Sequence, residues 1–249
     1  MDIIRTRNLA VGYGRTEVLR DLEFAVPEGR ITVVVGVSGS GKSTLLKTLA
    51  GLLPPLGGEF DFAGSRVDYR SEASLRFLYE KIGVLYQGGA LLNGLSLYEN
   101  VALPIRMHYP ELPEGVVRDM VFTGLAQVEM AESADKYPAE LSGGMRKRGA
   151  LARALVLNPE VVFCDEPSSG LDPITSSRLD EFLLRLKERN KMTLVVVTHE
   201  LRSIDRVADR VLLLHDGGLR FSGDYADLAS SDDGFIRTFF LRKDHHDDA

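Results

Sequence analysis

The segment GVSGSGKST, residues 36–44, constrains the fold of this chain more than any other. It follows the apolar run ITVVV (31–35) and opens a segment with helical spacing, STLLKTLAGLL (43–53). The pattern G-x-x-x-x-G-K-S between a strand and a helix is typical of loops whose backbone N–H groups surround phosphate oxygens. A glycine-rich turn without a ligand is the alternative, which the lysine, the serine and the flanking elements together disfavour. The segment therefore predicts a site for the phosphates of a nucleotide.

Two residue types in this loop suit specific parts of phosphate chemistry. Lys42 would bridge the β- and γ-phosphates of a nucleoside triphosphate, and the Ser43 hydroxyl would ligate Mg²⁺. The predicted phosphate-binding residues are Gly36, Val37, Ser38, Gly39, Ser40, Gly41, Lys42, Ser43 and Thr44. The loop by itself does not indicate what is done to the nucleotide.

Two further apolar runs, VVFC (161–164) and TLVVVT (193–198), also lack alternation of polar and apolar residues. Strands of this kind are buried on both faces, as in a parallel sheet covered by helices. Asp165 and Glu166 follow the first of these runs, and His199 follows the second. Ligands of open α/β sheets bind outside the carboxyl ends of the strands. We therefore expect these side chains to meet the glycine loop at one site.

The polar residues at the strand ends have functional and structural interpretations. Asp165 suits the carboxylate that holds Mg²⁺, and Glu166 suits the group that orients or polarises an attacking water. An ordinary Asp-Glu-Pro loop is the alternative, and the nearby glycine loop disfavours it. His199 is a candidate sensor of the γ-phosphate, although a single histidine is more often a capping or core residue. These positions favour hydrolysis of a nucleoside triphosphate.

A second candidate anion site lies in LSGGMRKRGALARAL, residues 141–155. Its serine and two glycines (142–144) precede a predicted helix, and three basic residues (146–148) follow in the first turn. Cations there face the positive end of the helix dipole, which is unfavourable unless an anion binds at that end. A solvated basic face is the alternative for at least one of the three. One domain thus has two predicted anion sites.

Composition and charge limit the class of protein. The chain has 249 residues, of which 44% are hydrophobic, and a net charge of −6. The acidic balance disfavours a nucleic-acid partner. The single cysteine, Cys164, excludes an internal disulfide. The first residues of the chain lack the pattern of a signal peptide, and no apolar run approaches the roughly 20 residues that span a bilayer. We expect a chain that reaches a membrane only through another protein.

Together these motifs resemble those of the ATP-binding cassettes of ABC transporters, and the likeness covers nearly the whole chain. The resemblance implies an α/β fold: a P-loop NTPase (RecA-like) core with a mostly parallel sheet, an N-terminal antiparallel β region and an inserted α-helical subdomain. It implies one ABC ATPase domain over 1–249. The core would comprise 1–87 and 158–223, the helical subdomain with the signature motif 88–157, and a C-terminal helix and tail 224–249.

The resemblance also implies roles for individual residues. Tyr13 in VGYG is similar to the aromatic residue that stacks on adenine, and Gln87 in VLYQ to the glutamine that contacts Mg²⁺ and the attacking water. Asp172 matches an aspartate at the dimer contact, although Asp172-Pro173 by itself indicates the start of a helix. The implied catalytic residues are Lys42, Gln87, Glu166 and His199, and the implied metal ligands are Ser43, Gln87 and Asp165.

The resemblance explains the second anion site. In the family, the residues matching Ser142, Gly143 and Gly144 close over the γ-phosphate bound to the glycine loop of a second cassette. Two half-sites that face apart on one chain imply a homodimer with two ATP molecules between the subunits. Met145 stands where the family signature usually has glutamine.

A narrower resemblance rests on GGALLNGLSLYENVALPI (88–105) and DEPSSGLDPITS (165–176), which are similar to the ATPases of MCE/Mla-type phospholipid transporters. It implies an ATPase that uses ATP and Mg²⁺ to power phospholipid transport between inner and outer membranes. Its partners would be integral-membrane permease subunits and a periplasmic MCE-domain protein. It would lie at the cytoplasmic face of the inner membrane, peripheral through its permease. Alternatives are the ATPase of an importer for another small substrate, a soluble non-transport ABC ATPase and a small-molecule kinase.

Two segments suggest contacts with other subunits. The apolar residues of 88–105 form part of a core, and the rest suit a groove for an amphipathic helix of the permease. The end of the chain, FIRTFFLRKDHHDDA (235–249), begins as an amphipathic helix and continues as a charged tail. One interpretation of its aromatic residues, Phe235, Phe239 and Phe240, is a contact with the second cassette. A frayed end accounts for the tail better than a metal site does.

Overall fold

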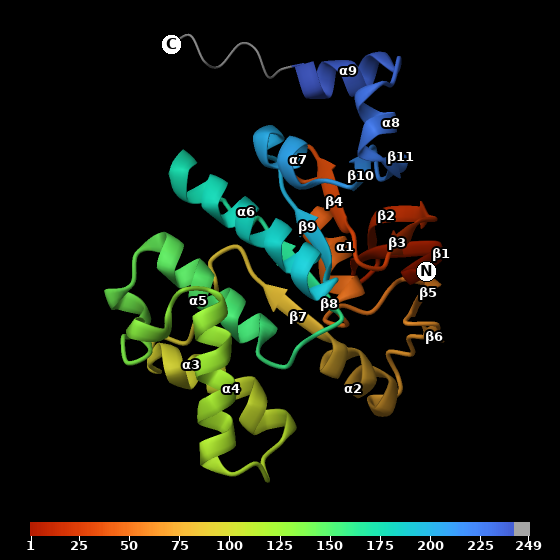
Figure 1. Cartoon of the computed structure of the whole chain (residues 1–249). Helices are drawn as coiled ribbons and strands as arrows, with labels where there is room; N and C mark the ends of the chain where they lie inside the picture. The colour runs from red at the N-terminus through yellow and green to blue at the C-terminus, as the bar shows by residue number, and fades with distance from the viewer. Residues whose placement is uncertain (242–249) are drawn as a thin grey trace.

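The computed structural model describes residues 1–241, without the side chains of Arg189, Asn190 and Leu241. The charged tail predicted at the end of the chain, with His245 and His246, therefore lies outside the described residues. Within 1–241 the chain forms two sheets with a group of helices beside them (Figure 1). No helix in this part of the chain is long and apolar enough to cross a membrane.

A mostly parallel six-stranded sheet forms the centre of the molecule. Its strands are β4 (Ile31–Gly36), β7 (Ile82–Leu85), β8 (Val161–Asp165), β9 (Thr193–Val197), β10 (Arg210–His215) and β11 (Gly218–Asp224). The order is β11-β10-β4-β9-β8-β7, and only the β10–β11 pair is antiparallel. The three apolar runs of the sequence are β4, β8 and β9, and every residue in them is buried. Their β-branched residues pack against neighbours on both faces of the sheet.

An antiparallel sheet of five strands covers one side of this core (Figure 1). Its strands are β1 (Asp2–Tyr13), β2 (Thr16–Leu22), β3 (Ala25–Pro27), β5 (Gly57–Phe62) and β6 (Ser65–Arg66). Helix α1 (Lys42–Leu49) packs between the two sheets, because Leu45 and Leu49 share one buried cluster with Phe163 of β8 and Phe60 of β5. The N-terminal β region thus fixes the helix that follows the glycine loop.

The remaining helices form a lobe beside β7 and a cover over the opposite face of the parallel sheet (Figure 1). The lobe consists of α3 (Leu97–His108), α4 (Glu114–Gln127) and α5 (Gly143–Leu155), with two short 3₁₀ turns at Ala131–Ser133 and Pro138–Glu140. The cover consists of α6 (Pro173–Asn190), α7 (Leu201–Val207), α8 (Tyr225–Ala229) and α9 (Gly234–Leu241). Helix α2 (Glu72–Lys81) differs, because its buried Leu78 packs in the cluster of α1. The predicted fold class is confirmed. The residue boundaries between core and helical subdomain stay a prediction.

One buried amide holds the loop that joins the core to the lobe. Asn100 in α3 donates from Nδ2 to the carbonyl oxygens of Leu92, Leu95 and Ser96, at 3.0–3.1 Å. Its Oδ1 accepts the N–H of Leu92 at 2.7 Å. Ser96 and Glu99 form a capping box at the start of α3, which fixes the same turn from its other side. The loop after Gln87 is therefore tied to the lobe by its backbone.

We expect Asn100→Ala to lower the free energy of unfolding by about 1–3 kcal/mol, because the N–H of Leu92 and the carbonyl oxygen of Leu95 lose their hydrogen-bond partner. Urea titration followed by circular dichroism measures the effect. Asn93→Ala, in the exposed part of the same loop, is the control and should stay within about 0.5 kcal/mol of the wild type. Equal stabilities for the two variants would contradict the role of Asn100.

Candidate functional site

A cavity of 670 Å³ opens at the carboxyl ends of the parallel strands. It collects most of the predicted catalytic and phosphate-binding residues. Its lining consists of Val18, Gly36, Val37, Ser38, Gly39, Gly41, Lys42, Ser43, Thr44, Gln87, Glu166, His199 and Phe239. The predicted convergence of the glycine loop with the residues after β8 and β9 is therefore present in the structure.

The pairing of the strands explains why these residues meet. Val34 of β4 lies opposite Val197 of β9, and Val197 lies opposite Asp165 of β8. The three strands thus end level with one another. Glu166 and His199, which follow two of these strand ends, therefore enter the same space as the glycine loop at the edge of the sheet.

Close contact with β2 explains a glycine in the phosphate loop. Gly41 immediately precedes α1 and has φ 94°, a conformation that L side chains rarely adopt. A Cβ atom at Gly41 would lie 2.8 Å from side-chain atoms of Val18 and Leu19. The loop is therefore pressed against the antiparallel sheet. The N-terminus of α1 faces the cavity and offers backbone N–H groups to an anion.

Lys42 and Ser43 begin α1 and reach towards two strand ends. The Lys42 ammonium donates to the carbonyl oxygens of Gly36 and Val37, at 2.9 and 3.0 Å. Burial lowers the pKa of Lys42, although the charges of Glu166 and Asp165 oppose this shift. The Ser43 hydroxyl donates to Oδ1 of Asp165 at 3.1 Å.

The oxygen ligands beside Ser43 fit a magnesium ion. Burial raises the pKa of Asp165, and the hydrogen bond from Ser43 partly offsets this shift. Gln87 lines the same cavity, and its Nε2 donates to Ser169 Oγ at 3.4 Å. Hydroxyl, carboxylate and amide oxygens are the hard donors that Mg²⁺ takes in proteins.

Glu166 and His199 form a contact at the wall of the cavity. His199 Nδ1 lies 2.8 Å from Glu166 Oε1. Glu166 has φ 49°, and its N–H donates to the Val197 carbonyl at 2.8 Å. Such a backbone conformation is unfavourable for a residue with a side chain and occurs where a site requires it. Its other oxygen, Oε2, is buried and has no hydrogen-bond partner within the described part of the chain.

The three basic residues after the signature glycines are not free cations. Arg146 donates to the Leu141 carbonyl at 2.6 Å, and Arg148 donates to the Val128 carbonyl at 3.4 Å. The Lys147 ammonium is buried and donates to the carbonyl oxygens of Glu166 and Ser169, at 3.1 and 2.6 Å. Arg148 also lines the cavity that holds the signature residues, and the interpretation of the three residues as partners of an anion stays a prediction. They satisfy backbone oxygens, and Lys147 supports the loop that carries Glu166.

The signature residues lie in a second cavity, of 490 Å³, which is separate from the first. Ser142 caps α5 by accepting the N–H of Met145 at 3.3 Å, and Asp172 caps α6 by accepting the N–H groups of Ile174 and Thr175, both at 3.0 Å. The two helix N-termini thus open into one space. Its predicted residues are Ser142, Gly143, Gly144 and Asp172.

Tyr13 lies at the end of β1 and lines neither cavity, with an exposed fraction of 49%. It pairs with Thr16 of β2, two residues before Val18. Val18 stands at a bulge, because the register shifts there from Gly12↔Glu17 to Val11↔Leu19, so Tyr13 and Val18 are near neighbours on two paired strands. Tyr13 therefore stands beside the mouth of the first cavity.

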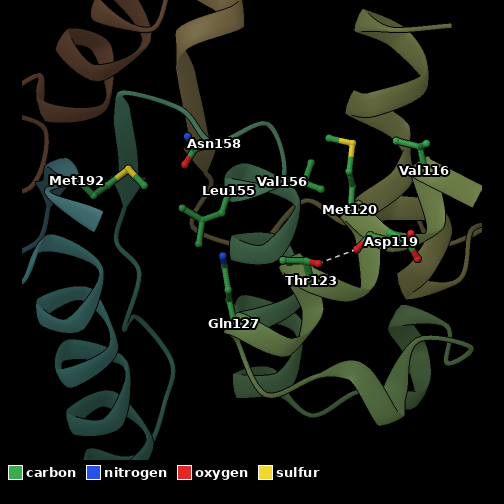
Figure 2. Close-up of a pocket in the computed structure, with 10 residues that line it drawn as sticks. Val116, Asp119, Met120, Thr123, Gln127, Leu155, Val156, Asn158 and Met192 are labelled. Carbon is green, nitrogen blue, oxygen red and sulfur yellow. Dashed lines mark hydrogen bonds between the residues drawn. The ribbon is translucent and has the colours of Figure 1, made fainter. Parts of the chain in front are cut away.

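A further cavity, of 430 Å³, lies between α4, the end of α5 and Met192 (Figure 2). Among its lining residues, Thr123 donates its hydroxyl to the Asp119 carbonyl at 2.7 Å. None of the predicted site residues lines it. We assign it no part in the chemistry of the other two cavities.

Three residues of the site were not predicted from the sequence. Val18 and Phe239 line the first cavity, and Lys147 positions the loop after β8. Val18 carries no motif. Phe239 belongs to an aromatic segment that we interpreted from the sequence as a contact with the second cassette. Lys147 could be recognised from the sequence only as one of three neighbouring basic residues. The only available signal was the clustering of aromatic residues near the end of the chain.

We expect Lys147→Met to lower the free energy of unfolding by about 1–3 kcal/mol, because two buried carbonyl oxygens lose a charged donor. Chemical denaturation gives this value. Arg148→Met, which removes a half-exposed pair with Glu129, should cost less than about 1 kcal/mol. The assignment fails if the lysine variant is as stable as the arginine variant.

Comparison with known proteins identifies the family. The family model for "ABC transporter" matches residues 19–169. The "Probable ribonucleotide transport ATP-binding protein mkl" of Mycobacterium tuberculosis is 38% identical over 239 residues, which are 95% of this chain and 66% of that protein. The "Intermembrane phospholipid transport system ATP-binding protein MlaF" of Haemophilus influenzae is 37% identical over 93% of this chain and 88% of that protein. MlaF of Escherichia coli is 33% identical over 96% of this chain and 88% of that protein.

Solved structures agree with this comparison. The cbiO1 protein of Clostridium perfringens, part of the ABC transporter complex cbiONQ, has a TM-score of 0.83 and 28% identity, covering 97% of this chain and 94% of that one. The ATP-binding cassette MJ0796, in a dimeric post-hydrolysis state bound to ADP and Pi, has a TM-score of 0.80 and 29% identity, covering 89% and 98%. The chain spans about two thirds of the length of its Mkl relatives and most of the length of MlaF. With its glycine loop and signature corner in two separate cavities of this fold, the chain belongs to the ABC transporter family as one of its ATP-binding cassettes.

Proposed function

We propose that the chain is the ATP-hydrolysing motor subunit of an ABC transporter that moves phospholipid between membranes. The observation that supports ATP hydrolysis is the separation of the glycine loop from the signature corner (Ser142, Gly143 and Gly144), because each lies in a cavity of its own. Phospholipid is favoured as the substrate because the MlaF relatives match this chain over most of both lengths. The Mkl relatives make another small substrate the alternative, and the chain covers a smaller share of them.

The triphosphate of ATP binds in the first cavity. The amides of residues 36–44 surround its β- and γ-phosphates. The Lys42 ammonium exchanges its two carbonyl partners, Gly36 and Val37, for phosphate oxygens, which carry more negative charge. Ser43, Asp165 and Gln87 hold Mg²⁺. The ion, when bound, neutralises charge on the β- and γ-phosphate oxygens.

Glu166 is the base that orients and polarises the attacking water. Its Oε1 is held by His199 and its buried Oε2 is left to accept a further hydrogen bond. His199, whose side chain is 65% exposed, is positioned to contact the γ-phosphate and Glu166 together. The backbone of Glu166 is fixed by Val197 and Lys147, so the carboxylate needs little rearrangement before reaction.

A second copy of the chain completes each site. Ser142, Gly143 and Gly144 sit at the N-terminus of α5, where backbone N–H groups and the helix dipole favour an anion. They lie outside the cavity that holds their own chain's glycine loop. In a two-fold homodimer each signature corner covers the γ-phosphate of the partner subunit. Binding of ATP closes the pair and hydrolysis opens it.

We expect Glu166→Gln to bind ATP with little change and to reduce hydrolysis by about 100-fold to 10,000-fold, because the amide cannot accept the proton of the attacking water. Phosphate release measures the rate, and Glu188→Gln on the exposed face of α6 is the matched control. Hydrolysis near the wild-type rate by the Glu166 variant would overturn its role as the base.

Mixing two inactive variants tests the composite site. Lys42→Ala and Ser142→Arg should each be inactive alone. A mixed dimer joins the intact Lys42 of one chain to the intact Ser142 of the other, so one of its two sites is complete. Hydrolysis should return on mixing to about a quarter of the wild-type level, since half of randomly formed dimers are mixed. No recovery, in mixtures shown by light scattering to contain dimers, would argue against completion in trans.

The permease subunit docks in a groove between the core and the helical lobe. A cavity of 520 Å³ lies there, with a largely apolar lining of Tyr79, Ile82, Gly83, Val84, Tyr86, Ala90, Leu103, Pro104, Met107, His108, Arg153, Ala154 and Leu157. Met107 is 73% exposed on α3. Arg153 of α5 donates to the carbonyl oxygens of Ala90 and Gly89, at 2.7 and 3.0 Å. An amphipathic helix in this groove contacts the loop after Gln87 and α5 together.

The proposed groove also accounts for the location of the chain. The permease holds it at the cytoplasmic face of the inner membrane, and an MCE-domain protein on the periplasmic side joins the complex through the same permease.

We expect Met107→Glu to weaken the binding of the chain to detergent-solubilised native membranes by about tenfold or more, because a carboxylate must be desolvated in the groove. Its basal hydrolysis should not change. Val116→Glu, exposed on α4, is the control, and equal retention of both variants would rule out this groove.

A further inference from the structure

The first cavity has an aromatic wall that comes from the C-terminal helix. Phe239 of α9 lines it together with the glycine loop and Val18. Figure 1 shows α8 and α9 beyond the β10–β11 end of the parallel sheet, far along the chain from the other residues of the cavity. None of the phosphate-binding or catalytic groups needs this ring, because an aromatic face offers no donor to a phosphate oxygen.

Contacts within the chain hold α9 in this place. The Asp233 carboxylate accepts the N–H groups of Phe235 and Ile236, at 2.8 and 3.1 Å, and also pairs with Arg220 of β11. The ring of Phe235 lies 4.0 Å from the ring of His215, measured between centroids. Ile236 is buried. The start of α9 is thus docked on its own β10–β11 hairpin, and the contact of the aromatic residues with the second cassette stays a prediction.

The docking of Phe235 sets the direction of Phe239. The two residues are four positions apart on a helix and therefore share a face. Their ring centroids are 6.1 Å apart. Phe240 points differently, since it does not line the cavity. Phe239 thus continues an aromatic row from His215 to the mouth of the nucleotide cavity.

The part of the cavity near Phe239 is the place for a nucleobase. Val18 lines it and lies two residues along β2 from Thr16, which pairs with Tyr13, the residue expected to stack on adenine. Val18 also contacts the phosphate loop at Gly41. A nucleotide whose phosphates lie in the loop therefore has its base near Val18 and Tyr13. Bases stack on any aromatic face, and each such contact contributes substantially to affinity.

We infer that Phe239 is a base-contact residue that forms, in the same chain as the glycine loop, a second aromatic wall for the nucleobase. This inference rests on the proposed binding of ATP and deepens it. The C-terminal helix is then part of the nucleotide site. It should contribute to the affinity for nucleosides of any base, because stacking does not depend on hydrogen-bonding edges.

A tryptophan placed at this position tests the contact directly, because the sequence contains no tryptophan. In Phe239→Trp of the full chain, ADP should quench the fluorescence of the new indole through stacking, whereas pyrophosphate, which lacks a base, should not. Phe240→Trp on the same helix is the control and should respond weakly to both. Quenching by pyrophosphate as strong as that by ADP, or none with ADP at saturation, overturns the inference.

Affinity provides a second measurement and separates this inference from the proposed function. Calorimetry should show that Phe239→Ala weakens ADP and GDP binding by about fivefold or more and leaves pyrophosphate binding unchanged. Tighter binding of ADP and pyrophosphate alike would mean that the ring only blocks the cavity. If the wild-type chain bound no nucleotide, the proposed function itself would fail. If it bound ADP and Phe239→Ala bound equally well, only the base contact would fail.

A last control assigns the contact to one chain. Lys42→Ala combined with Phe239→Trp should lose quenching by ADP even after wild-type chain is added, because the indole reports only on its own glycine loop. Recovery of quenching on adding the wild-type chain would place Phe239 in the partner's site and overturn the contact within one chain.

Discussion

The parallel pairing of β4, β8 and β9 determines the position of most polar groups in the nucleotide cavity. Because these strands end level, the glycine loop, Asp165, Glu166 and His199 emerge along one short edge of the sheet. The strands carry no charged residue before that edge, and all their residues are buried. The apolar core and the chemistry therefore depend on the same register. A shift of one strand by a residue would misplace a catalytic group and move every core side chain of that strand to the other face of the sheet.

Residues with a local pattern could be predicted from the sequence. The loop 36–44 has a fixed spacing between two recognisable elements. Asp165, Glu166 and His199 follow runs that can only be buried strands, and a rule for open α/β sheets brings such positions together. Ser142 and Asp172 could be placed at helix starts by residue type, and both do cap helices. The parallel sheet followed from the same elements, whereas the full fold class was implied by the resemblance to ABC cassettes.

Residues whose role depends on distant packing could not be predicted. Lys147 is one of three neighbouring cations, and nothing nearby in the sequence distinguishes the one that reaches the carbonyl oxygens of Glu166 and Ser169. Val18 and Phe239 are apolar residues without a motif, and only the folding of β2 and α9 brings them to the cavity. Asn100 also has an ordinary position in its helix, although its amide makes four contacts to one loop.

Helix α5 is hydrogen-bonded near both ends to loops that follow strands of the core. Near its start Lys147 is bonded to the loop of Glu166, and near its end Arg153 is bonded to the backbone at Gly89 and Ala90. In a homodimer the first residues of this helix serve the opposite ATP, while its lysine supports the base that acts on the chain's own ATP. In the proposed homodimer a displacement of α5 at one ATP would therefore act on the loop of the catalytic base at the other.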